Sequence, residues 1–301
     1  NQAFTELRDL LRDLDEPLEF DAEGALLVAG TRFKGALAER VKKAAIEING
    51  RPYVRDTFLQ RVPDLVRIFE ASSPELRVRS TTSVAEAERL HAAASALLPL
   101  LYEDFDARPE RRLQLAVLGE RKFYDQYLDV AGLPGHHAAD GFADRVAGTA
   151  VLCKAGSTDE FVLGLALHEL THLYQLSVSP AVFPSWYLEG SAETYGGEGA
   201  FRWDGETLET RGMMAAARLS DVRATPFPLR ELLQGEALTL LASDRPAALR
   251  FYAQSWAFLR FLRDGAGEEF AERLERWRTM CFGSAAGADF DKPYQNDAAT
   301  S

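Results

Sequence analysis

The chain has little of what a disulfide scaffold or a membrane protein needs. It contains two cysteines in 301 residues, Cys153 and Cys281. That is too few for a disulfide framework or a thiolate zinc site, so both are expected to be buried thiols. The longest apolar stretch, residues 92–101, is well short of the roughly 18 residues that a membrane-spanning helix requires. We therefore expect no membrane span.

Basic residues are also in the minority. Thirty-four Lys and Arg against 46 Asp and Glu give a formal net charge of -12. Neutralising nucleic-acid phosphates requires clustered basic side chains, so the expected partner is a peptide, a protein or a small molecule, and not a nucleic acid. The numbering begins at Asn1 without a methionine, which leaves the compartment open and slightly favours an extracytoplasmic or secreted protein. The oligomeric state is not indicated.

Hydrophobic periodicity predicts an α+β protein. Residues 1–74 are expected to form a mostly helical region, with helices over 4–14, 33–48 and 56–71 and a short hairpin that turns near residues 23–24. A Ser-Ser-Pro segment after residue 71 interrupts the helical period and is the predicted domain boundary. A second domain, 75–282, follows, with extended segments 75–80, 111–118 and 147–154, helices 84–104 and 120–130, and a mostly helical part beyond residue 200. Residues 283–301 are expected to be a weakly ordered tail.

One segment of this second domain, "GLALHELTHLYQ" at 164–175, carries two histidines four positions apart. The sequence Ser-Thr-Asp-Glu at 157–160 has the form of a capping box and predicts a helix that continues to residue 176. Because four residues advance by about one helical turn, His168 and His172 project from the same face and can bind one ion. Neutral imidazoles suit Zn²⁺. Glu169, beside the first histidine, can then act as a general base without binding the ion.

A catalytic zinc site takes a third protein ligand, and the sequence offers one soon after. In "SWYLEGSAETYGG", Glu189 and Glu193 are four apart on a second predicted helix. Glu189 is the predicted third ligand. Glu193 is expected to accept a hydrogen bond from the far N–H of a zinc-bound imidazole and so fix its tautomer. Gly190 would let the two helices approach closely.

These motifs, "HELTH" followed by "WYLEGSAETY", resemble those of the gluzincin zinc metallopeptidases, which include thermolysin, the zinc aminopeptidases and the bacterial peptidase MA-like proteins. The resemblance implies a gluzincin-like domain: a small mixed sheet with an active-site helix, followed by a mostly helical part. It also implies His168, His172 and Glu189 as Zn²⁺ ligands, Glu169 as the base and Glu193 behind them. The Gly-x-Met-Glu-Asn segment of the aminopeptidases is absent, so aminopeptidase specificity is not supported.

Peptide hydrolysis also needs a donor for the developing oxyanion. No histidine follows His172, so the donor is sought among Tyr, Arg and Lys. Tyr252 lies in a segment that resembles the one in which aminopeptidases and peptidase MA-like proteins place a tyrosine near the metal. Tyr195 is the alternative. The predicted strand 147–154 is either buried or at an edge, and as an edge it is the candidate for pairing with substrate backbone. Two histidines at 136–137, in a Gly-bounded loop before it, are expected to be solvated.

Three functions remain open from sequence. The first is a zinc metallopeptidase, expected to be an endopeptidase, in which Glu169 deprotonates a zinc-activated water that attacks the peptide bond. The second is a non-catalytic zinc-stabilised binding or scaffold protein with a gluzincin fold, for which Glu169 would have no use. The third is a hydrolase of other bonds, or a processing enzyme restricted to one partner by the N-terminal region.

Overall fold

A five-stranded mixed sheet organises the larger part of the chain. The computed structural model describes residues 18–28, 31–48, 51–54, 68–145 and 147–282. The sheet has the order β6-β7-β8-β10-β9, with β7, β8 and β10 parallel to one another and with β6 and β9 antiparallel at its two edges. The strands are β6 (Phe69–Ser72), β7 (Leu76–Ser80), β8 (Leu113–Leu118), β9 (Gly141–Asp144) and β10 (Thr149–Cys153).

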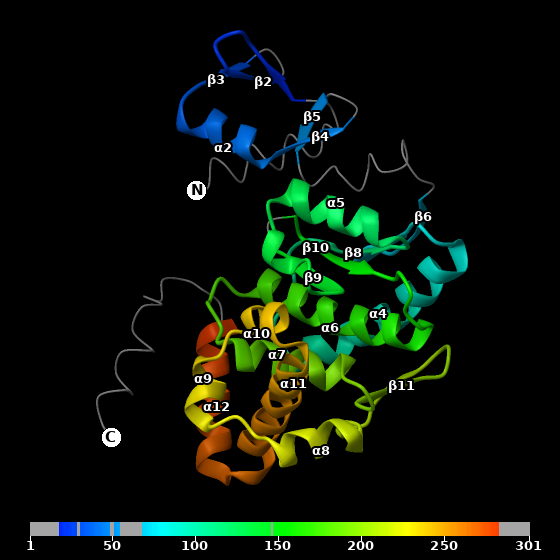
Figure 1. Cartoon of the computed structure of the whole chain (residues 1–301), viewed down its shortest axis with the longest axis vertical. Helices are drawn as coiled ribbons and strands as arrows, with labels where there is room; N and C mark the ends of the chain where they lie inside the picture. The colour runs from blue at the N-terminus through cyan, green and yellow to red at the C-terminus, as the bar shows by residue number, and fades with distance from the viewer. Residues whose placement is uncertain (1–17, 29–30, 49–50, 55–67, 146, 283–301) are drawn as a thin grey trace.

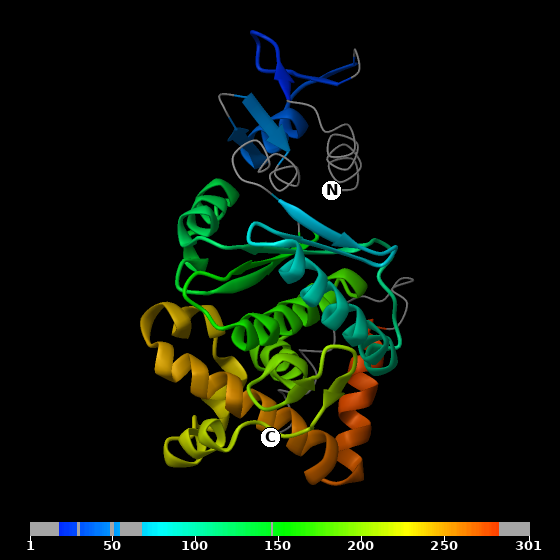
Figure 2. The same cartoon turned by 90° about the vertical axis from the view of Figure 1, so that its right-hand side faces the viewer.

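Helices cover both faces of this sheet (Figures 1 and 2). On β8, Leu115 and Val117 pack into the core shared with α4 (Val84–Phe105) and α6 (Asp159–Val178), while Ala116 and Leu118 pack toward α5 (Arg121–Ala131). A strand that is buried on both faces is nearly continuously apolar rather than alternating, which explains why Gln114 is the only polar residue in the sequence "LQLAVL" of β8. The sheet thereby provides the rigid layer against which α6 lies.

The C-terminal part of the described chain is mostly helical. Helix α7 (Ser185–Gly196) packs between α6 and α11 (Arg245–Arg260), and several shorter elements and α12 belong to the same part of the chain. They are the hairpin β11 (Phe201–Trp203) and β12 (Leu208–Thr210), then α8 (Ala216–Ala224), α9 (Leu229–Gln234), α10 (Ala237–Ser243), η4 (Phe261–Gly265) and α12 (Glu268–Phe282). The predicted mixed α+β class with a small mixed sheet is confirmed.

Only part of the region 1–74, which is expected to be mostly helical, belongs to the described residues. Its described residues form the strands β1 (Glu19–Phe20), β2 (Leu26–Val28), β3 (Thr31–Phe33), β4 (Ala45–Ile48) and β5 (Arg51–Val54), with one helix, α2 (Ala36–Ala44), among them. The predicted turn near residues 23–24 is confirmed, since β1 pairs with β2 across it. The helix expected over 33–48 is shorter, because the apolar and β-branched residues after Ala44 pair with β5.

Two other expected helices fall wholly or partly outside the described residues. The helix expected over 4–14 lies wholly outside them, and residues 56–67 of the helix expected over 56–71 also lie outside them. The end of that segment is strand β6, which pairs with β7, so the sheet includes residues on both sides of the boundary expected at 74/75. The tail 283–301 also lies outside the described residues.

Other predictions concern burial and strand edges. Cys153 and Cys281 are buried free thiols, as expected, and no helix among the described residues is long and apolar enough to cross a membrane. Segment 147–154 forms the buried strand and not the edge: β10 is buried throughout and is paired on both sides, with β8 and with β9. The edge strand beside α6 is β9. This strand was not predicted, because the Gly-rich and Pro-containing sequence before it indicated a loop.

Candidate metal centre

Helix α6 begins one residue later than the predicted capping box. The hydroxyl of Thr158, not that of Ser157, accepts the capping hydrogen bond, from the backbone N–H of Phe161 at 3.2 Å. Acidic Asp159 and Glu160 occupy the first turn, where they complement the helix dipole. The helix then runs for 20 residues, so both histidines lie far from its ends and on a rigid segment.

Three side chains from α6 and α7 converge at one point. Nε2 of His168 lies 3.1 Å from Nε2 of His172, and Oε2 of Glu189 lies 3.3 Å from the first of these nitrogens and 3.5 Å from the second. The three side chains are 11% to 13% exposed. The structure thus brings together the three predicted ligands, as a group that could hold a metal ion.

The spacing of these three atoms suits a tetrahedral ion. Ligands about 2.0 to 2.1 Å from a tetrahedral Zn²⁺ lie about 3.3 Å from one another, which is the range of the three observed separations. Oε2 of Glu189 is buried and makes no hydrogen bond within the described structure. A buried carboxylate oxygen in this state is costly unless a cation or donor satisfies it, so the donor set fits a divalent ion.

Close helix packing produces this convergence. A Cβ atom built on Gly196 of α7 would lie 2.5 Å from the backbone N of His168 and closer still to the backbone O of Gly164. Only glycine permits this approach of α7 to α6. Gly190 has a different partner from the one predicted: its Cβ would meet the backbone O of Ser255 in α11 at 2.7 Å. Gly190 therefore brings α7 against α11, while Gly196 brings α7 against α6.

Glu193 lies beside His168, on the side of its ring that faces away from Glu189, as predicted. Its Oε1 is 3.6 Å from Nδ1 of His168, on the opposite side of the ring from the nitrogen that faces Glu189. Its other oxygen is 3.5 Å from the guanidinium of Arg218 in α8. Arg218 also donates to the backbone O of Leu249 at 3.2 Å, which fixes it against α11. Sequence reasoning missed Arg218, because no pattern links it to the histidines.

Glu169 points from α6 toward the edge strand β9. A Cβ on Gly141, the first residue of β9, would lie 2.9 Å from Cγ and 3.0 Å from Oε1 of Glu169, so the carboxylate occupies space that any other residue at 141 would fill. Burial raises the pKa of Glu169, against the lowering influence of His168 and His172. A carboxylate with a raised pKa is a stronger base, and this one lies beside the edge strand β9 and next in sequence to the ligand His168.

Tyr252, on α11, lies against the same group. Its ring centroid is 6.1 Å from that of His168. Burial, and then the charges of Glu189, Glu169 and Glu193, raise the pKa of the Tyr252 hydroxyl, which keeps it a hydrogen-bond donor at any physiological pH.

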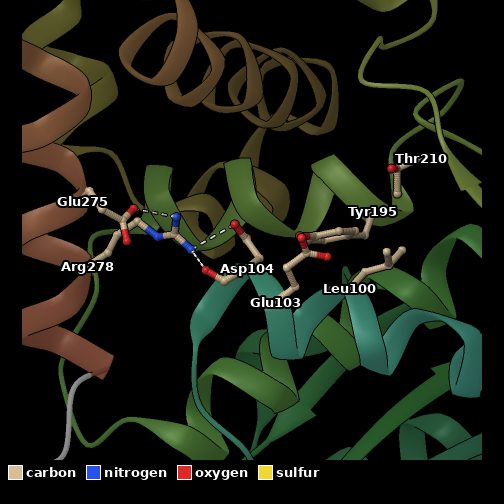
Figure 3. A pocket seen from close by; sticks show the side chains of 7 residues that line it. All are labelled: Leu100, Glu103, Asp104, Tyr195, Thr210, Glu275 and Arg278. Atoms are coloured by element: carbon tan, nitrogen blue, oxygen red, sulfur yellow. Dashed lines mark hydrogen bonds and ion pairs between the residues drawn. The ribbon is translucent and has the colours of Figure 1, made fainter. Parts of the chain in front are cut away.

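The alternative donor, Tyr195, points elsewhere. It lines a separate cavity of about 390 Å³ with Asp104 and Arg278, between α4, α7 and α12 (Figure 3). Burial and the nearby Asp104 raise its pKa. Tyr195 is thus removed from the metal group, and its alternative role is not supported by its position.

The pKa values of the ligand side chains show how their charges interact. Burial alone would lower the pKa of His168, but the adjacent carboxylate of Glu189, with the charges of Glu169 and Glu193, raises this pKa to about 9. Conversely, burial would raise the pKa of Glu189, while His172 and His168 lower it to about 2. Excess carboxylate thus faces the imidazoles, which favours a cation at this point.

The other side chains considered in the sequence analysis pack against, or pair with, neighbouring protein groups. Trp186 is 9% and Tyr187 1% exposed in the core, so both pack as expected. His137, in the loop before β9, pairs with Asp129 at 2.9 Å and Asp125 at 3.2 Å. His136 packs on Phe142, with ring centroids 5.1 Å apart.

Comparison of the chain with models of known protein families and with curated proteins finds no match.

Proposed function

We propose that this protein is a zinc-dependent metallopeptidase of the gluzincin type. The observation that carries the proposal is the near-equilateral arrangement of two imidazole nitrogens and one carboxylate oxygen, with a separate buried carboxylate, Glu169, one residue from the first ligand. Three ligands with a fourth position left for water are typical of catalytic rather than structural zinc. When bound, the ion supplies Lewis acidity to a water and to the substrate carbonyl.

Each side chain around the proposed ion has a separate role. His168, His172 and Glu189 would hold the ion, and Glu193 would fix the orientation of the His168 ring through its far nitrogen. Glu169 accepts a proton from the attacking water and then donates it to the nitrogen of the leaving amine. The Tyr252 hydroxyl donates a hydrogen bond to the carbonyl oxygen as negative charge develops there.

Strand β9 is the proposed site for the substrate backbone. It is the edge of the sheet, and its first residue contacts the Glu169 side chain. An extended peptide can add to such an edge through main-chain hydrogen bonds, which would place a peptide bond beside the carboxylate that must deliver the proton. An extended peptide or protein segment is therefore the proposed substrate.

The test is zinc content and cleavage of a mixed peptide pool by the wild type and by Glu169→Gln. We expect both proteins to bind zinc and the variant to lose cleavage by at least about a hundredfold, the range of a general base. Equal cleavage by the two would refute a catalytic role for Glu169. Zinc binding without cleavage by the wild type would instead favour the second candidate, a zinc-stabilised binding or scaffold protein.

A further inference from the structure

A cluster of charged residues lies where the chain enters the edge strand β9. Arg245, the first residue of α11, donates from one guanidinium nitrogen to Oδ2 of Asp140 at 2.8 Å and from the other to the backbone O of Ala138 at 3.3 Å. Asp140 immediately precedes β9. This contact joins two segments more than 100 residues apart in sequence, and it lies at the N-terminal end of the proposed substrate strand.

Arg245 faces the same side of α11 as Tyr252. Seven residues separate them, which is two helical turns on one face and about 10 Å along the axis. Since Tyr252 lies against His168, Arg245 is on the same face of α11 as the residue that contacts the metal group. The short helix η3 (Pro134–His136), which comes shortly before Ala138 in sequence, contacts α10, the helix that precedes α11.

The direction of a bound peptide follows from the sheet. A peptide that adds antiparallel to β9, the commoner pairing in sheets, has its C-terminal end at the N-terminal end of β9. That end holds Asp140 and Arg245. A carboxylate at the C-terminus of the peptide would therefore meet a guanidinium, which binds carboxylates through paired hydrogen bonds.

Arg245 has the capacity for this contact. Its side chain is 51% exposed, and its two hydrogen bonds within the described structure use two of the five N–H donors of a guanidinium. Asp140 is also paired with Arg121 at 3.1 Å. It would therefore keep a cationic partner when Arg245 turns to a substrate.

We propose that Arg245 binds the C-terminal carboxylate of the substrate, so that the protein releases short C-terminal fragments instead of cutting within chains. The two groups that Arg245 binds, Asp140 and Ala138, lie one residue and three residues before Gly141, which adjoins Glu169, so the released fragment is expected to be one to three residues long. This inference rests on the proposed peptidase function, and it replaces the expectation of an endopeptidase with a defined substrate class: peptides with a free C-terminus.

The experiment compares one peptide in two forms, with a free C-terminal carboxylate and as the C-terminal amide. For the zinc-loaded wild type we expect kcat/KM to be at least about tenfold higher for the free acid, the size of effect expected for one charge-assisted hydrogen-bonded pair. In Arg245→Gln this ratio falls to about one. Arg260→Gln is the matched control, because Arg260 lies on the same helix, is 50% exposed and pairs with Asp264 at 2.7 Å; it should keep the wild-type ratio.

The same peptide pair distinguishes failure of this inference from failure of the peptidase function. Affinities of the two forms for zinc-loaded Glu169→Gln, measured by calorimetry, report the carboxylate preference without turnover, and a ratio near ten supports the inference even if nothing is cleaved. Equal binding of acid and amide, an unchanged ratio in Arg245→Gln, or first products cut from the middle of a longer peptide would each overturn it.

Discussion

Replacement of Gly196 by alanine tests whether close packing of α7 on α6 creates the metal centre. The new Cβ would lie 2.5 Å from the backbone N and 2.7 Å from Cβ of His168. Ordinary contacts begin at 3.4 Å, so the helices would have to separate by about 0.9 Å at this point. None of the opposing atoms belongs to a flexible side-chain end that could turn away.

The cost follows from overpacking. Inserting a methyl group into a well-packed site destabilises by about 1 to 3 kcal/mol, partly offset by the helix preference of alanine, worth up to about 1 kcal/mol. We expect a net loss of about 1 to 2 kcal/mol in the free energy of unfolding. Because the separation occurs beside His168, it also moves Glu189 away from the imidazoles, and we expect zinc affinity to fall by at least about tenfold, equivalent to about 1.4 kcal/mol.

The assays are urea unfolding of the metal-free protein and zinc competition with a fluorescent chelator. Gly135→Ala is the matched control, since its Cβ would meet nothing within 4 Å, and it should match the wild type in both assays. If Gly196→Ala binds zinc as tightly as the wild type, the idea that this contact sets the ligand geometry is wrong.

Three other changes separate the roles of individual side chains. Gly141→Ala should displace the Glu169 carboxylate and lower kcat by about tenfold or more while zinc content stays at the wild-type level; loss of zinc would contradict this division. Glu193→Gln should weaken zinc binding by about 10- to 100-fold, measured by chelator competition, and unchanged affinity would exclude its supporting role. Hydrogen bonds to Asp129, then Asp125, raise the pKa of His137. The stabilising charge of His137 is therefore fully present below about pH 6.5 and is lost as the pH rises through the folded-state pKa. In urea titrations, His137→Gln should lower the free energy of unfolding more at pH 6 than at pH 9, and equal effects at the two pH values would refute this.

Local spacing explains why the core of the site could be predicted from sequence. His168 and His172 share a helix face by their separation, and the same holds for Glu189 and Glu193. These pairs need only the helix to form, and the sequence around each pair favours a helix. The meeting of the two helices was an inference from chemistry, and the structure brings the predicted ligands within 3.5 Å of one another.

Features that depend on tertiary distance could not be predicted in this way. Arg218 reaches Glu193 from a separate helix, and the need for glycine at 141 and 196 arises from neighbours far away in sequence. Gly190 was assigned to the wrong helix pair for the same reason. Strand β9 was missed because its four residues are too few to show an alternating pattern.

The N-terminal region shows a different limit. Residues 45–48 continue a helical pattern in sequence but form strand β4, which is stabilised by pairing with β5. Pairing between strands overrides local preference, and local preference is all that periodicity reports.

Zinc stoichiometry of purified wild type and Glu189→Ala tests the central claim most directly. After saturation with zinc and removal of excess by gel filtration, elemental analysis should find about one ion per chain in the wild type, held by three protein ligands. The variant, with two imidazoles alone, should retain less than about a tenth of that. A wild type without zinc, or a Glu189→Ala variant that keeps a full equivalent, would contradict the account.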